Sequence, residues 1–156
     1  MILDKFQDSL IWIAEKLNNQ NIGWALTGSC NLAFQGIDIS WVNDIDIIVL
    51  GSDFKKAEII FKDNLVYPAK NKTMNEGIKL SYETFKFKIN NIEVEIIKEG
   101  DLRYNYLSKK EDKLIKKKLD KTMIFCYPLK VELAAYQKLS RFNKAEKIKQ
   151  FLNNKK

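Results

Sequence analysis

Two aspartates at the start of an apolar strand are the residues of this sequence best suited to chemistry. In the stretch WVNDIDIIVL (41–50), Asp44 and Asp46 alternate with isoleucines. Because side chains alternate between the two faces of a strand, both carboxylates are expected on one face. The run that follows, 47–50, is wholly apolar and is typical of a strand buried on both sides. Two like charges at its entrance repel each other unless a cation lies among them.

A Gly-Ser pair upstream of the aspartates could bind phosphate. Gly28 and Ser29 lie between a predicted strand at 22–28 and a predicted short helix at 29–36. A glycine at such a junction lets the backbone approach a ligand closely, and the free N–H groups at the start of a helix favour an anion. We therefore expect a phosphate group near this turn.

A second acidic strand follows later in the chain. In IEVEII (92–97), Glu93 and Glu95 alternate with apolar residues. If this strand neighbours the one that carries the aspartates, three or four carboxylates crowd together. Hard oxygen ligands of this kind suit Mg²⁺ or Mn²⁺, with the phosphates of a nucleotide triphosphate completing the coordination. The alternative is a solvated hairpin face, on which the glutamates pair with Lys86 and Lys88 across the turn.

Composition excludes several catalytic schemes. The 156 residues include no histidine, which removes Ser-His-Asp and Cys-His nucleophile systems and the zinc sites that use histidine. Any catalysis must depend on carboxylates, lysines, hydroxyls or a metal held by oxygen ligands. The formal net charge of +7 is as consistent with simple solubility as with a polyanionic partner. The lysine-rich run at 109–118 is interpreted as a solvated helix face, with an RNA-binding surface as the alternative.

The order of these motifs resembles the nucleotidyltransferase superfamily with the DNA polymerase β fold. GWALTGSCNLAFQG followed by NDIDIIVL is similar to its small members. These are the minimal nucleotidyltransferases, the antibiotic-modifying enzymes and the toxin-type enzymes of toxin–antitoxin pairs. VELAAYQKL resembles a helix of some of these families in which a glutamate precedes a lysine by six residues, here Glu132 and Lys138. The resemblance implies that Lys138 contacts a triphosphate.

The resemblance also implies a role for each of the other matched positions. Gly28 and Ser29 would hold the β- and γ-phosphates of the incoming nucleotide. Asp44 and Asp46 would bind one or two Mg²⁺ ions. Glu95 would be the third carboxylate, either as a metal ligand or as the base on the acceptor hydroxyl. The implied reaction moves an NMP from an NTP to that hydroxyl by in-line attack on the α-phosphorus, with release of pyrophosphate.

Two departures from the superfamily pattern leave alternatives open. The third acid is usually an aspartate, whereas this chain offers two glutamates, so Glu93 remains an alternative to Glu95. The segment 40–43 lacks the arginine or threonine that several relatives place before Asp-x-Asp. The alternative function is a non-catalytic module of the same fold that binds nucleotide or RNA. The acceptor is open between RNA or tRNA, a small hydroxylated molecule and a protein side chain, and an antitoxin protein is a possible partner.

The periodicity of apolar residues predicts an α+β fold with a mixed or antiparallel sheet of four to five strands and flanking helices. Expected strands are 22–28, 44–50, 85–89, 92–97 and 122–127, with Asn90-Asn91 as a hairpin turn. Expected helices are 2–18, 29–36, one that begins at Ser52 or Asp53, one that Ser108 opens and that includes Leu114, Ile115 and Leu119, and two within 129–152.

These elements are expected to form a single nucleotidyltransferase-like domain over residues 1–156, with a mostly helical C-terminal part from about residue 105. No apolar run approaches the roughly 18–20 residues that span a bilayer. Cys30 and Cys126 are far apart in a chain without a secretory signal. A cytoplasmic location is therefore expected, with both cysteines reduced and buried.

Overall fold

The chain forms helices packed on one mixed sheet, and the computed structural model describes residues 4–39, 42–76, 78–100 and 114–155. The helices are α1 (Asp4–Asn19), α2 (Gly28–Phe34), α3 (Phe54–Ile60), α5 (Leu129–Lys138) and α6 (Phe142–Asn154). The strands are β1 (Trp24–Thr27), β2 (Ile45–Val49), β3 (Leu65–Glu76), β4 (Ile78–Ile89), β5 (Ile92–Lys98), β6 (Ile115–Leu119) and β7 (Thr122–Cys126). Short 3₁₀ turns at Gly51–Asp53 and Lys62–Asn64 flank α3. In the described ranges, every helix is too short or too polar to cross a lipid bilayer.

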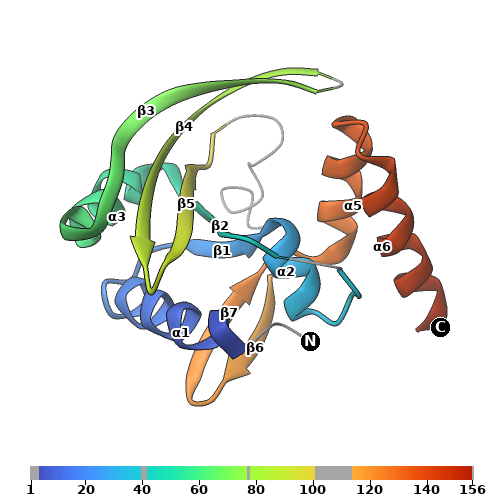
Figure 1. Cartoon of the computed structure of the whole chain (residues 1–156), viewed down its shortest axis with the longest axis horizontal. Coiled ribbons are helices and arrows are strands. Elements are labelled where there is room, and N and C mark those ends of the chain that lie inside the picture. Colours follow the sequence, from blue (N-terminus) through green and yellow to red (C-terminus); the bar gives the residue numbers. More distant parts are fainter. Residues whose placement is uncertain (1–3, 40–41, 77, 101–113, 156) are drawn as a thin grey trace.

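The seven strands of the described sheet follow the order β3-β4-β5-β2-β1-β7-β6. The pairs β2–β5 and β1–β7 are parallel, and the other neighbours are antiparallel. Figure 1 shows the long β3–β4 hairpin curving over one side of the sheet, with α5 and α6 side by side at the other end. The predicted α+β class and mixed sheet are confirmed, but four to five strands was too few.

The two strands that were not predicted have sequences without a clear strand signal. The later part of β3, AKNKTMNE, is mostly polar and includes two lysines and two asparagines, and β3 forms the outer edge of the long hairpin, so it has no alternating apolar pattern. The predicted helix through Ile115 and Leu119 is wrong, because these residues bound strand β6. A spacing of four places two residues on one side of a helix and also on one face of a strand. The start of that predicted helix, 108–113, lies outside the described residues.

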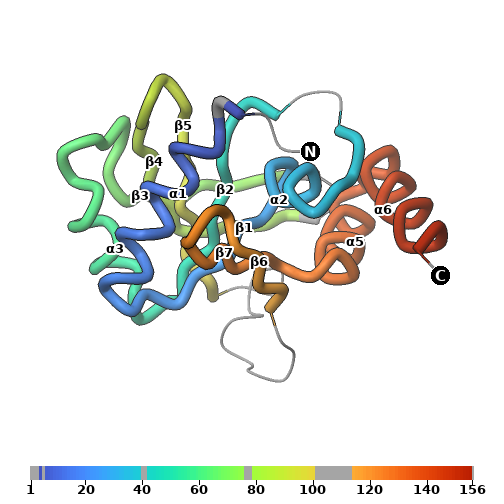
Figure 2. The backbone as a smooth tube through the Cα atoms, turned by 90° about the horizontal axis from the view of Figure 1, so that it is seen from below, coloured from blue at the N-terminus to red at the C-terminus, as the bar shows by residue number. Residues whose placement is uncertain are grey.

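Helices α1 and α3 cover one face of the sheet, as the view from below shows for α1 (Figure 2). Apolar residues of α1 pack with the inward residues of β2 and β5 in one core cluster. From these strands it includes Ile45, Ile47, Val49, Val94 and Ile96, all of which are buried. The residues between them, Asp46 and Glu95, must therefore point to the opposite face.

The opposite face has a smaller apolar cluster at one end and polar residues beside it. Ile48 and Ile97 pack there with Ala25, Leu80, Tyr82 and Tyr127. A third cluster joins α2 to α5 and α6 through residues such as Leu32, Tyr136 and Ile148. The C-terminal helices are therefore fixed against the helix that begins at Gly28.

Most of the predicted local structure is confirmed with small changes of boundary. The predicted hairpin turn is one example, because Asn90 and Asn91 both have positive φ angles, of 51° and 64°. This conformation is the one that two-residue hairpins with a matching twist require.

Burial makes both cysteines poor nucleophiles. Cys30 and Cys126 are free thiols with no exposed surface. Burial raises the pKa of Cys126 to about 12. Burial, together with the nearby Asp46 carboxylate, also raises the pKa of Cys30.

We therefore expect neither thiol to react with a disulfide reagent in the folded protein at neutral pH. Each thiol should react only after the chain unfolds, so the rate of unfolding should limit the observed rate. A rise from pH 7 to pH 9 should therefore accelerate the reaction only slightly. The urea-unfolded chain serves as the control, in which both thiols should react at once. A rapid native phase equal to one thiol per chain would contradict this account.

Candidate active site

The parallel pairing of β2 and β5 places two of the predicted acids side by side. Asp46 and Glu95 are register partners, so their Cα atoms face each other across neighbouring strands. Both side chains point to the sheet face away from α1 and α3, since the residues on either side of them are in the main core. Asp44 directly precedes β2 and is exposed, Asp46 is half-buried, and the Glu95 side chain is 13% exposed. Strand pairing thus brings acids from separate segments together.

Glu93 pairs instead with a lysine of the neighbouring strand, β4. Its side chain is 44% exposed, and its Oε1 accepts a hydrogen bond from Lys86 Nζ at 3.0 Å. That hydrogen bond and the positive charge of Lys86 lower the pKa of Glu93. The solvated-hairpin interpretation therefore describes Glu93, while Glu95 is the glutamate opposite Asp46 in the strand register.

The β3–β4 hairpin supplies the partners of Glu95. Its Oε2 atom accepts hydrogen bonds from Thr84 Oγ1 at 3.0 Å, from Tyr67 OH at 3.3 Å and from Lys72 Nζ at 3.3 Å. The Lys72 contact is also an ion pair. Burial, followed by the Glu95 charge, raises the pKa of Tyr67, which stays a hydrogen-bond donor at neutral pH. These three donors, all on β3 and β4, orient the carboxylate of Glu95 toward that hairpin.

Gly28 lies against the carboxylate of Asp46. Thr27 and Asp46 are register partners in the antiparallel β1–β2 pair, and α2 begins at the next residue. Gly28 has a φ angle of +72°, and a Cβ atom at this position would lie 2.7 Å from Asp46 Oδ2. Only glycine satisfies both the left-handed backbone and this close approach. The predicted Gly-Ser turn and the predicted acidic pair are therefore adjacent.

A buried glutamate from α5 anchors the Gly-Ser turn. Glu132 is 3% exposed, and its Oε1 accepts a hydrogen bond from Thr27 Oγ1 at 2.7 Å. Its Oε2 accepts from the backbone N–H of Gly28 at 2.8 Å and from Asn31 Nδ2 at 3.1 Å. The sequence singled out Glu132 only through the resemblance. In the structure it fixes the turn through hydrogen bonds from Thr27, Gly28 and Asn31.

The lysine nearest the turn was not predicted. Lys144, in the first turn of α6, donates a hydrogen bond from Nζ to Ser29 Oγ at 2.8 Å. Burial, followed by the charge of Arg141, lowers the pKa of Lys144, although Asp46, Glu132 and Asp44 act in the opposite direction. The predicted Lys138 is exposed in the last turn of α5. In so lysine-rich a sequence, nothing distinguished Lys144 from its neighbours.

The described side chains do not form a complete binding site for a divalent cation by themselves. Within the described residues, no group of three or more acidic or cysteine side chains is placed to hold a metal ion. The expected crowd of three or four carboxylates therefore does not form there. Asp44 and Asp46 nevertheless offer hard oxygen donors on one face. Mg²⁺ commonly binds one or two carboxylates and takes its remaining ligands from water and substrate phosphates. This donor set suits an ion that a nucleotide completes.

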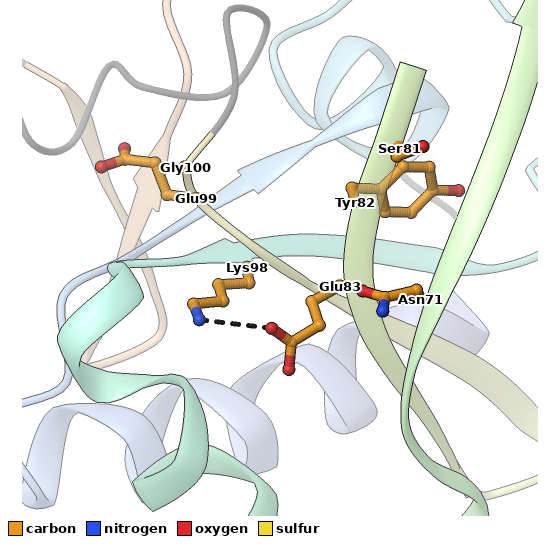
Figure 3. A pocket seen from close by; sticks show the side chains of 7 residues that line it. All are labelled: Asn71, Ser81, Tyr82, Glu83, Lys98, Glu99 and Gly100. Carbon is orange, nitrogen blue, oxygen red and sulfur yellow. Dashed lines mark hydrogen bonds and ion pairs between the residues drawn. The ribbon is translucent and has the colours of Figure 1, made fainter. Parts of the chain in front are cut away.

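Two pockets occur near these elements. A pocket of about 390 Å³ at the α5–α6 turn is lined by residues 140–144, so it includes Lys144 and adjoins Ser29. Figure 3 shows a second, polar pocket of about 230 Å³ at the end of β5, where Lys98 and Glu83 form an ion pair at 3.3 Å. None of the predicted site residues lines this second pocket.

Comparison with known proteins identifies the fold. No protein-family model and no curated protein matches the sequence. A candidate nucleotidyltransferase from Thermotoga maritima superposes with a TM-score of 0.72 at 24% identity, over 99% of this chain and 96% of that one. ANT(2")-Ia in complex with adenylyl-2"-tobramycin gives 0.59 at 12% identity, over 94% and 88%. An antigenic nucleotidyltransferase-like protein from Paracoccidioides brasiliensis gives 0.54 at 11%, over 95% and 77%. The chain has the fold of nucleotidyltransferase structures.

The anchoring role of Glu132 predicts a loss of stability in Glu132→Gln. The amide keeps the size of the side chain, but it has one acceptor oxygen instead of two and no negative charge, so the hydrogen bonds from Thr27, Gly28 and Asn31 are lost or weakened. We expect the free energy of unfolding in urea to fall by about 1–3 kcal/mol. Glu146→Gln, at an exposed position of α6, is the control and should change it by less than about 0.5 kcal/mol. Equal effects of the two substitutions would contradict the anchoring role.

Proposed function

We propose that the chain is a divalent-metal-dependent nucleotidyltransferase that moves an NMP from an NTP to an acceptor hydroxyl and releases pyrophosphate. The observation that carries the proposal is the adjacency of Asp46 to both Glu95 and Gly28. Acids beside a glycine turn are what a site for a metal and a triphosphate requires. The fold shared with nucleotidyltransferase structures supports the same conclusion.

In this proposal Asp44 and Asp46 hold Mg²⁺ or Mn²⁺, with Glu95 as the third carboxylate. Glu95 is preferred over the alternative, Glu93, because it is the register partner of Asp46 and is less exposed, although each glutamate pairs with a lysine. When bound, the ion would neutralise the charge that develops on the phosphates. Glu95, which Thr84 and Tyr67 orient through hydrogen bonds to one oxygen, would accept the proton of the acceptor hydroxyl or complete the metal site.

Gly28 and Ser29 would receive the β- and γ-phosphates. The glycine lets the turn approach the Asp46 carboxylate closely, so a phosphate at the turn would lie near the proposed metal ligands. Ser29 offers a hydroxyl that already contacts Lys144. The half-buried ammonium of Lys144 would bind phosphate more strongly than an exposed one, because fewer water molecules screen it. The geometry therefore favours Lys144 over Lys138 for the triphosphate contact that the resemblance implies.

The acceptor class is proposed more broadly. A surface with net charge +7 suits an RNA or tRNA end, and a small hydroxylated molecule is the other candidate. The ANT(2")-Ia complex contains an adenylylated aminoglycoside, which supports testing this second class. An antitoxin partner and a cytoplasmic location remain predictions.

The second candidate function is a non-catalytic module that binds nucleotide or RNA. One observation favours it: the Glu95 oxygen Oε2 is already engaged by three donors, including the ammonium of Lys72. A glutamate held in this way would be a poor base if Lys72 stayed in place. Calorimetric titration separates the candidates, because a binding module takes up Mg²⁺-NTP without releasing pyrophosphate in the presence of any acceptor.

The proposed metal site predicts that Asp44→Asn abolishes transfer. With an NTP labelled at the α-phosphate, Mg²⁺ and either RNA or an aminoglycoside, we expect the rate of label transfer to fall at least about a hundredfold. Asp63→Asn is the matched control, since Asp63 is exposed in the turn after α3, and its rate should equal that of the unmodified protein. Full activity of Asp44→Asn would remove the assigned metal site.

The proposed phosphate site predicts that Lys144→Met weakens binding of tripolyphosphate about tenfold or more, because a charge-assisted hydrogen bond is lost. Lys138→Met is the control and should leave the affinity unchanged. Only the protonated amine binds phosphate, and the pKa of Lys144 is lowered from 10.5. The affinity should therefore decline, as pH rises, at a lower pH than for an ordinary lysine. A larger loss in Lys138→Met would overturn the choice of Lys144.

A further inference from the structure

A pocket away from the candidate active site combines apolar walls with lysines. It has a volume of about 570 Å³ and lies between strand β6 and helices α5 and α6. Its apolar lining consists of Ile115, Pro128, Leu129, Phe151 and Leu152. Lys117, Lys130 and Lys155 line it as well, and none of its described lining residues is acidic. Ile115 is 38% exposed, which is unusual for an isoleucine. None of the predicted site residues lines this pocket.

The strand beside the pocket lies at the edge of the described sheet. Within the described part of the chain, β6 is the last strand of the sheet and pairs with β7 alone. Its outer backbone N–H and C=O groups can therefore accept a further strand. Residues 115–118 of β6 are all exposed, and three of them are lysines. Lysines on an edge repel neutral or basic strands from pairing, but they attract an acidic one.

The aromatic rings at this surface are already covered. Lys155 Nζ lies 4.7 Å from the centre of the Phe151 ring. Lys117 Nζ lies 5.2 Å from the centre of the Phe34 ring and donates a hydrogen bond to the Phe34 carbonyl oxygen at 3.2 Å. Proteins that bind single-stranded nucleic acid use open aromatic faces on which bases stack. Among the described residues, the two rings here each have a lysine ammonium near one face, which favours a peptide over RNA. A second copy of the chain would bring the same lysines and be repelled.

We propose that β6 and this pocket, which together we term the β6 surface, bind an extended acidic segment of a partner protein. The backbone of the segment pairs with the outer edge of β6, and its carboxylates face Lys116 and Lys118, which strand alternation places on the face opposite Ile115 and Lys117. An aliphatic side chain of the segment enters the pocket between Ile115 and Leu152. The inference is independent of the proposed nucleotidyl transfer.

The test measures fluorescence anisotropy of a labelled peptide that alternates glutamate with leucine, mixed with the full chain. We expect saturable binding that weakens with added salt, because the contact is partly electrostatic. The double variant Lys116→Glu/Lys118→Glu should lose at least about tenfold in affinity. The matched control is Lys55→Glu/Lys62→Glu, which makes the same change of charge at exposed positions in and after α3 and should bind like the unmodified chain.

Two further measurements keep the proposal falsifiable if the charge-reversed chain unfolds. Ile115→Ala removes only apolar contact area and should also weaken binding. A peptide methylated at alternate backbone nitrogens should bind less well, because it cannot pair with the strand edge. The proposal would be overturned if Ile115→Ala bound the peptide as tightly as the control variant does. It would also be overturned if the methylated and unmethylated peptides bound equally well. Tighter binding of a single-stranded oligonucleotide at this surface, or self-association of the chain in sedimentation, would overturn it as well.

Discussion

The parallel register of β2 against β5 is the constraint on which the candidate site depends. It places Asp46 opposite Glu95, and a shift of one residue would turn Glu95 to the other face of the sheet. The register is fixed by packing, since Ile45, Ile47 and Val94 are fully buried in the core beneath α1 and α3. The hydrophobic core and the acidic site are thus the two faces of the same pair of strands.

The C-terminal helices contribute two side chains that contact the Gly-Ser turn of the site. Glu132 on α5 accepts three hydrogen bonds from the segment around Gly28, and Lys144 on α6 contacts Ser29. A buried carboxylate is costly to desolvate, and such a group is retained where its hydrogen bonds fix a geometry. The helical part of the chain therefore helps to position the glycine turn, because Glu132 accepts the hydrogen bond of the Gly28 N–H.

The sequence predicted the parts of the site that depend on local pattern. Asp44 and Asp46 share a face because of strand alternation, and Gly28 was identifiable because a sharp junction between a strand and a helix often needs the backbone freedom of glycine. The choice between Glu93 and Glu95 could not be made, since it depends on the register of β2 against β5. Lys144 could not be found either, because its contact with Ser29 joins residues far apart in the chain. The same holds for β6, whose apolar spacing fits a helix and a strand equally well.

The most direct test of the account is a crystal structure of the chain with Mn²⁺ and a non-hydrolysable NTP. The account predicts an anomalous peak at coordination distance from the carboxylates of Asp44 and Asp46, with the β- and γ-phosphates against Gly28 and Ser29. An ion bound elsewhere, or a triphosphate that lies away from the glycine turn while Asp46 stays unliganded, would contradict the central claim.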